Sequence, residues 1–245
     1  MSSSNRLAMF LLGASLALGF AWSASMLSGA LVRMRQENLI RVKGLAERTL
    51  VSNHATWACE FWTRATELQA GYAALEGSRR RVADHLAAAG VLPAELAWSP
   101  VEIRAEHRKD EKGNPTNTIE FHVLSQSATV RTADVAKVDR VSKGVTELIK
   151  AGVELRSNPP QFVYTELESV KMDLLGKATK NAHERAVTLA SNSGGRVGAL
   201  NAAAQGIFQI TPLHSTETSD GGCYDTSTID KSVKAVVTLE FQVER

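Results

Sequence analysis

Residues 7–32 form a run without a single charged side chain, and this run constrains the chain more than any other feature of its sequence. A helix that crosses a bilayer needs about 20 mostly apolar residues, and the run exceeds that length. Its small residues, among them Gly13 and Gly19, permit close contact between helices, and Trp22 is placed for a membrane interface. We therefore expect a short tail over residues 1–6 and a single transmembrane anchor over residues 7–32.

The larger apolar side chains of the run are expected to form this anchor: Leu7, Phe10, Leu11, Leu12, Leu16, Leu18, Phe20, Trp22, Leu27 and Leu31. A secretory signal peptide is the alternative, because a basic start, an apolar middle and the small residues of AWSASM are typical of a cleavable leader. An uncleaved anchor is favoured, since the run is longer than a usual signal core of about 7–15 residues.

Two features of the sequence give conflicting predictions for the orientation of the anchor. Arg33, Arg35, Arg41 and Lys43 follow the run, whereas Arg6 precedes it, and by the positive-inside rule this asymmetry places the body of the chain in the cytoplasm. The signal-like pattern indicates export instead. We favour export.

The body, residues 39–245, has the composition of a folded protein. The whole chain of 245 residues is 44% hydrophobic and carries a net charge of +2, from 28 basic and 26 acidic residues. This balance gives no broad basic surface for nucleic acid. Two cysteines are too few for a disulfide scaffold and are not spaced as a zinc site.

Alternating apolar side chains predict strands in the body. Residues 40–51 have strand character, and Ala55, Trp57, Cys59 and Phe61 alternate with more polar neighbours. These two strands, separated only by residues 52–53, are expected to form a hairpin. Trp62 falls opposite the buried side chains, and an exposed tryptophan on a strand is a modest indication of a protein interface.

Further elements follow in order along the chain. Helices are expected over residues 68–86, over 135–148 with Thr132 as N-cap, and over 169–193 with a stripe of Ala178, Ala182, Ala186 and Ala190. Strands are expected over residues 101–103, 119–130 with a change of phase near residue 124, 162–164, 197–210 and 233–243. Residues 214–229 are expected to form a mobile polar loop. The order predicts an α+β fold of βαββ-like units, with antiparallel sheets and helices packed on one face.

No catalytic, cofactor-binding or metal-binding residue is predicted. His183 and Glu184 match the start of a zinc-protease motif, but Val187 stands where that motif needs its second histidine. The glycines of 194–198 follow a predicted helix, whereas those of a dinucleotide-binding loop precede one. Cys223 has no neighbouring base to activate it. The basic run Arg79, Arg80 and Arg81 is expected on a solvated helix face, with contact to anionic headgroups or an acidic protein as its alternative role.

Several blocks of the sequence resemble SIMPL-domain proteins. RVKGLAERTLVSNHATW, with Gly44, Glu47 and Trp57, resembles their opening strand pair. The resemblance continues through VRTADVAKVDRVSKGVTELIKAGVEL and FVYTELESVKMDLLGKATKNAHERAVTLASNSGGRVG, and ends in AAQGIFQI and KAVVTLEFQV. It covers residues 39–244, except that the 214–229 loop does not align. The preceding apolar run is similar to that of the membrane-anchored bacterial branch.

The resemblance implies an α+β protein that is exported, or anchored in the bacterial inner membrane with its C-terminal domain in the periplasm. It also implies self-association into large ring- or cage-like homo-oligomers and a link to envelope or oxidative stress. It supplies no catalytic residues. We therefore expect a non-enzymatic protein whose partners are further copies of itself and, through the anchor, the lipid bilayer. The alternatives are an envelope enzyme with an unrecognised site, or a binding module that uses residues 79–81.

Overall fold

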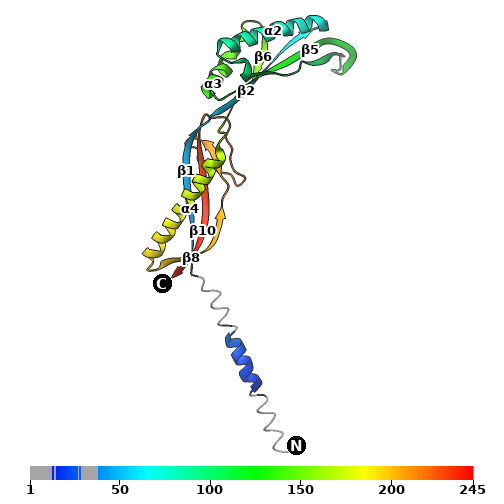
Figure 1. The fold of residues 1–245 in the computed structure, drawn as a ribbon. Coiled ribbons are helices and arrows are strands. Elements are labelled where there is room, and N and C mark those ends of the chain that lie inside the picture. Colours follow the sequence, from blue (N-terminus) through cyan, green and yellow to red (C-terminus); the bar gives the residue numbers. More distant parts are fainter. Residues whose placement is uncertain (1–12, 14, 27, 29–37, 245) are drawn as a thin grey trace, which may run out of the picture. The chain divides into compact units, whose positions relative to one another are not determined.

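The computed structural model describes residues 13, 15–26, 28 and 38–244 (Figure 1). The chain divides into two compact units. The first comprises Met1–Leu45, Lys177–Gly206 and Val236–Arg245, and the second comprises Ala46–Gly176 and Ile207–Ala235. Three elements contribute residues to both units: strand β1 (Leu39–Val51), helix α4 (Leu167–Asn192) and strand β10 (Asp230–Glu244).

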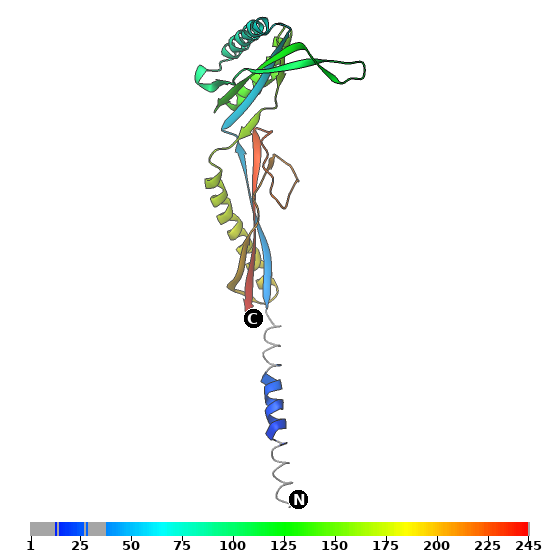
Figure 2. The same ribbon diagram turned by 90° about the vertical axis from the view of Figure 1, so that its right-hand side faces the viewer.

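The sheet of the first unit has β10 at its centre. The strand order is β1-β10-β8, where β8 is Arg196–Gln205. β9 (Gln209–Pro212) belongs to the second unit and pairs with the part of β10 that lies in that unit. Both β8 and β9 run antiparallel to β10. Figure 1 and Figure 2 show α4 lying along these strands.

Small residues bring α4 and β1 into close contact within the first unit. A methyl group built on Gly44 would lie 2.1 Å from the carbonyl oxygen of Ala178 and 2.7 Å from the Cβ of Ala182. The stripe Ala178, Ala182, Ala186 and Ala190 is fully buried, as its spacing of four predicts. The helix and the strand therefore meet with almost no side-chain volume between their backbones.

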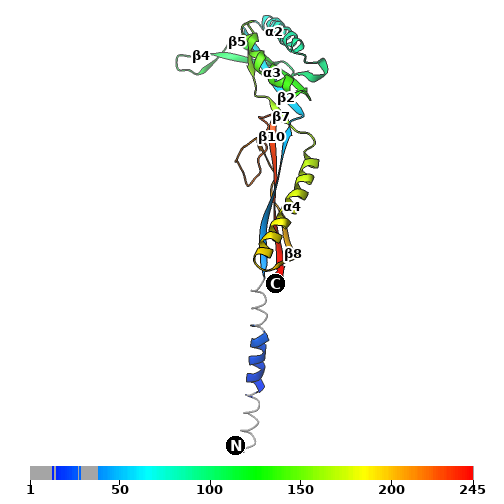
Figure 3. The same cartoon turned by 90° about the vertical axis from the view of Figure 1, so that its left-hand side faces the viewer.

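The second unit contains a six-stranded antiparallel sheet. Its strand order is β3-β5-β2-β6, with β4 also paired to β5 and β7 to β2. Figure 3 shows β4 and β5 continuing as a hairpin beyond the rest of this sheet. The strands are β2 (His54–Ala65), β3 (Leu96–Trp98), β4 (Glu102–Lys109), β5 (Pro115–Thr132), β6 (Glu154–Ser157) and β7 (Gln161–Val163).

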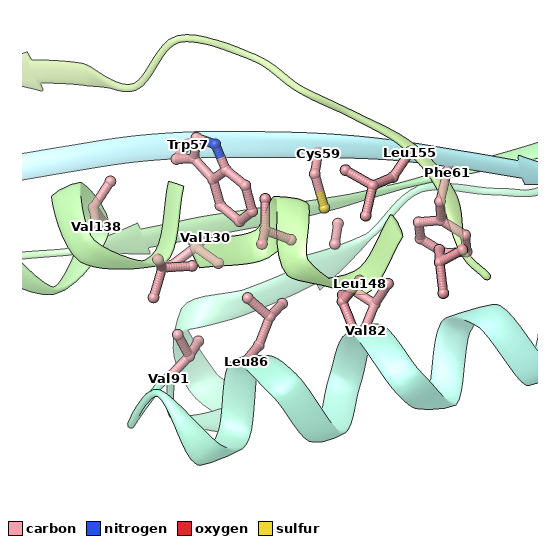
Figure 4. Close-up of a cluster of buried hydrophobic side chains, with 14 of the residues drawn as sticks. Trp57, Cys59, Phe61, Val82, Leu86, Val91, Val130, Val138, Leu148 and Leu155 are labelled. Atoms are coloured by element: carbon pink, nitrogen blue, oxygen red, sulfur yellow. The ribbon is translucent and has the colours of Figure 1, made fainter. Parts of the chain in front are cut away.

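Large side chains fill the core of the second unit, which lies on one face of its sheet. Helices α2 (Leu68–Ala88) and α3 (Val135–Gly144) cover this face, and two short 3₁₀ helices, Pro93–Glu95 and Val145–Ile149, adjoin them. Trp57, Cys59 and Phe61 point from β2 toward Val82 and Leu86 of α2 (Figure 4). The α+β class and the antiparallel sheets predicted from the sequence are thus confirmed.

The predicted hairpin of residues 40–51 and 55–62 is wrong, although both strands exist. β1 pairs with β10, whereas β2 pairs with β5, β6 and β7. The two linking residues bond elsewhere: the amide of Ser52 donates to the carbonyl of Ile229 at 2.9 Å and that of Asn53 to Val163 at 3.1 Å. Ser-Asn lacks the glycine that a two-residue hairpin turn prefers, so the chain continues from one sheet into the other.

Two further expectations need correction. Thr132 is not the N-cap of α3; Asp134 is, and its carboxylate accepts from the amide of Lys137 at 2.9 Å. The Thr132 hydroxyl instead donates to the carboxylate of Glu95. The phase change near residue 124 of β5 is confirmed, because Leu124 and Ala128 are buried whereas Phe121 lies on the opposite face.

The polar segment 214–229 is bound more firmly than the predicted mobile loop. The buried side chain of Gln209 donates to the carbonyl of Ser219 at 2.7 Å and accepts from the amide of Cys223 at 2.9 Å. Lys231 is buried, and its ammonium donates to Asp225 at 3.0 Å and to the carbonyl of Thr228 at 2.6 Å. Burial raises the pKa of Asp225, but hydrogen bonds from Thr228 and Ser227 outweigh it and hold this pKa below its usual range.

Candidate functional site

Strand β8 leaves one long edge of the first sheet open. Among the described residues it pairs only with β10, and its residues from 199 to 205 are all exposed. Its sequence, RVGALNAAAQ, contains one charge, at Arg196, and no proline. Edge strands of soluble proteins normally carry charges, prolines or bulges that prevent pairing with another chain. The outer edge of β8 therefore has little protection beyond the irregular register that it shows against Phe241 and Val243.

The register of β8 identifies the backbone groups on this edge. Gly206, directly after the strand, donates its amide to the carbonyl of Val236 at 2.8 Å. Residues of an antiparallel pair alternate between bonding their partner and pointing away from it. The continuing register pairs Gln205 with Val237 and Ala203 with Leu239, so the amides and carbonyls of Gln205 and Ala203 point outward. Since no other described strand pairs with this edge, these groups can bond a further strand.

The edge of β1, by contrast, is partly covered by side chains of α4. The guanidinium of Arg185 donates to the carbonyl of Lys43 at 3.2 Å, and the amide of Leu45 donates to the side chain of Asn181 at 3.2 Å. The sheet of the first unit thus has one edge that α4 partly satisfies and one that is open.

A polar contact across three strands fixes the position of β8. Glu240 of β10 accepts from Arg41 of β1 at 2.6 Å and from the Asn201 amide of β8 at 2.7 Å. The hydrogen bonds from Arg41 and Asn201 lower the pKa of the Glu240 carboxyl, so it is ionised at neutral pH. The contacts of Glu240 with Arg41 and Asn201 hold β8 in a defined register with the other strands of the sheet.

A groove of about 600 Å³ lies beside β1 in the same unit. It is lined mainly by Arg41, Lys43, Glu184 and Arg185. Two of its three cationic groups are already engaged, Arg41 with Glu240 and Arg185 with the Lys43 carbonyl. The Thr188 hydroxyl, also in its lining, donates to the carbonyl of Glu184 at 2.9 Å. The groove is therefore a polar surface feature whose side chains are mostly engaged within the chain.

The chemically reactive side chains do not converge. Among the described residues, no group of three or more histidine, cysteine, aspartate or glutamate side chains is arranged to hold a metal ion. Both cysteines are free thiols. Burial raises the pKa of Cys59 to about 12, which keeps it protonated and unreactive at neutral pH. Cys223 is half-buried in the segment held by Gln209.

Trp62 lies on the outer face of the six-stranded sheet, opposite the core, as the alternation predicts. Its indole nitrogen donates to Glu154 of β6 at 2.8 Å, and the side chain is half-buried. The basic run of α2 separates into two parts. Arg79 lies 5.0 Å from the ring centre of Trp98 and pairs with Glu76 at 3.3 Å, whereas Arg80 and Arg81 are exposed.

The predicted anchor lies only partly within the described residues. Residues 15–26 are helical, and Leu16, Leu18, Phe20 and Trp22 are exposed on that helix. Of the part of the chain that the structure describes, no helix has the length and apolar character needed to cross a membrane. The remaining predicted anchor residues fall outside this part: Leu7, Phe10, Leu11, Leu12, Leu27 and Leu31.

Sequence reasoning did not single out the open edge of β8. The signal was present, because no charge occurs between Arg196 and Glu217 in a segment predicted to be a strand. Its position at the end of a sheet depends on β10, which is distant in sequence, and local patterns do not reveal such pairing.

Comparison with known proteins gives one informative match. No curated protein matches the chain. The sequence matches the SIMPL family, described as a protein of unknown function (DUF541), over residues 40–241, and this range includes residues of both compact units. The agreement extends from β1 to β10, so the chain belongs to the SIMPL family.

Proposed function

We propose that this chain is a non-enzymatic, membrane-anchored protein that self-assembles into a large ring- or cage-like homo-oligomer. It would sit in the bacterial inner membrane, with the SIMPL domain in the periplasm and a structural role in the cell envelope under stress. The uncharged run of residues 7–32 supports the membrane anchor, and the periplasmic location is what the resemblance to SIMPL-domain proteins implies. The open edge of β8 is the single observation that carries the self-assembly.

The physical reason is that unpaired backbone groups on an uncharged strand favour pairing with another strand. The side chains of β8 from Ala199 to Gln205 are small or apolar, except for Asn201 and Gln205, so a second strand can approach closely. A second β8 is the best-matched partner, because two copies of the same edge can pair antiparallel about a two-fold axis. The outward amides and carbonyls of Ala203 and Gln205 would then bond across the interface.

A structural role is supported by the state of the reactive and charged side chains described above, which are buried or already paired within the chain. Cys59 is buried, and the guanidinium groups of Arg41 and Arg185 in the β1 groove are engaged within the chain. An anchor on every subunit would attach such an assembly to the bilayer at many points.

The test replaces one outward-pointing residue of β8 in the full-length protein. Ala203→Pro removes an amide that points away from β10, so it should block pairing at the open edge without breaking a bond to β10. Ala203→Val is the matched control, because it retains the amide and favours a strand. Mass is measured in mild detergent, with circular dichroism to verify folding.

The expected result is a large wild-type particle, an equally large Ala203→Val particle and a smaller Ala203→Pro particle. A wild-type protein that remains a single copy would overturn the proposal. A folded Ala203→Pro variant with the wild-type mass would show that assembly does not use this edge.

A further inference from the structure

Pairing of two β8 edges closes after two copies, because a two-fold interface uses the same surface on both partners. A larger assembly built on this pair therefore requires a second surface. We propose that the outer face of the six-stranded sheet is that surface and that it binds the same face of another copy. This inference rests on the proposed self-assembly but involves different residues.

An acidic row crosses the outer face of this sheet. The register aligns Glu154 of β6, Trp62 of β2, Ser125 of β5 and Glu102 of β4. Residues paired across antiparallel strands point to the same face, so both carboxylates flank the tryptophan on the side away from the core. Trp62 donates to Glu154, while Glu102 is exposed at the other end of the row.

A basic row lies directly beside the acidic one. Two residues further along the strands, the register aligns Arg64 of β2, Val123 of β5 and Arg104 of β4. Both arginine side chains are largely exposed, at 56% for Arg64 and 75% for Arg104. Among the described residues, the ion pairs of these two arginines are exposed: Arg64 with Glu154 at 3.6 Å and Arg104 with Glu106 at 2.9 Å. Such pairs contribute little and can be exchanged.

The two rows make this face complementary to itself. If a two-fold axis runs parallel to the rows and halfway between them, the acidic row of one copy meets the basic row of the other. Each strand then faces the same strand of its partner, so Glu102 of one copy meets Arg104 of the other, twice by symmetry. Opposite charges facing each other in this way fix the register of an interface and disfavour other partners.

The same axis brings an arginine to the tryptophan. Trp62 lies in the acidic row of β2 and would face Arg64 of the second copy, in the arrangement of a cation–π contact. The face is hollowed by a groove of about 610 Å³, lined by both arginines, Trp62 and Phe121 among others. The long arginine side chains of a second copy would fill this groove.

The test exchanges charges between copies of the full-length protein in mild detergent. Glu102→Arg places two arginines opposite each other in the interface, and Arg104→Glu places two glutamates there. Each variant alone should fall to the mass of two copies, joined through β8. Co-expression of the two variants restores both attractions, so the mixture should regain the wild-type mass.

Further variants separate this proposal from a folding defect and from the β8 interface. The double variant Glu102→Arg, Arg104→Glu in one chain should also assemble, whereas Glu111→Arg at the hairpin tip, a matched charge change away from this face, should have no effect. Combining Glu102→Arg with Ala203→Pro should give single copies.

Single charge variants that keep the wild-type mass would overturn the inference, and so would a mixture that stays at two copies. If Ala203→Pro has no effect while the charge variants still dissociate the particle, the proposed β8 interface is wrong and the proposed interface on the outer sheet face is supported.

Discussion

In the second unit, helix α2 meets the sheet through large side chains, with Val82 and Leu86 against Cys59 and Phe61. In the first unit, α4 meets β1 through Gly44 and a stripe of buried alanines. Both arrangements exclude water, but one fills the space between elements and the other removes that space. The first kind of core should be sensitive to lost volume and the second to added volume.

Removal of a ring from the large-residue core should have the largest effect. Phe61 is fully buried and packs at 6.1 Å, centre to centre, against Trp98. Phe61→Ala should lower the free energy of unfolding by about 3–5 kcal/mol, because it leaves a cavity beside rigid neighbours. Ile149→Ala, at an exposed site, should change it by less than about 0.5 kcal/mol. Denaturant titration measures both, and equal losses would contradict this view of the core.

Addition of one methyl group should damage the small-residue core nearly as much. Gly44→Ala should cost about 3 kcal/mol or more, because the new carbon collides with the backbone of α4 and the helix must move away. Gly176→Ala, in the same helix with no atom within 4 Å of the added carbon, should instead stabilise by about 0.5–1 kcal/mol. A Gly44→Ala protein with wild-type thermal stability would refute the close contact.

A smaller effect is expected at Glu95, in the second unit. Hydrogen bonds from Thr132, the Leu92 amide and Lys137 lower the pKa of Glu95 from 4.5 to about 2. A folded-state pKa below the unfolded value stabilises the protein above pH 4.5, and this contribution is lost as the pH falls toward 2. Glu95→Gln should cost about 1.5–3 kcal/mol at neutral pH.

The pH dependence provides the check on Glu95. Unfolding measured from pH 6 downward should show a shallower loss of stability in Glu95→Gln than in wild type, with Glu111→Gln at the exposed hairpin tip as control. Parallel curves for wild type and Glu95→Gln would show that the carboxylate contributes nothing to the pH response.

The smallest expected effect is on the labelling of cysteine thiols, which reports how well the core protects a thiol from a reagent in solution. Cys59 is buried and protonated at neutral pH, whereas Cys223 is half-buried, so a thiol reagent should add one group to the native chain and two after denaturation. Cys223→Ser should leave the native chain unlabelled. Rapid native labelling of Cys59 would mean that the large-residue core opens readily.

Local patterns predicted the faces of elements well. The alternation around Trp57 and Phe61 identifies the buried face of β2, and the four-residue spacing of alanines identifies the buried stripe of α4. Both succeed because burial of a face follows directly from the period of a strand or helix.

Strand partners were harder to predict. β1 and β2 adjoin in sequence, yet they lie in different sheets, because β1 finds its partner almost two hundred residues away in β10. The candidate site depends on another pairing between strands that are not adjacent in sequence, since β8 becomes an edge only through its position beside β10. Polar contacts such as Glu240 with Arg41 and Asn201 also require strands to be placed side by side, which single-sequence patterns do not reveal.

The central place of β10 has a consequence for the order of events during synthesis. The ribosome makes β1 early, β8 much later and β10 after both, yet β10 lies between them in the sheet. Until β10 emerges, neither strand has its neighbour, and pairing across so long a stretch of chain is slow. Because β8 acquires a fixed register only against β10, association through its edge would be delayed until the chain has been made through β10.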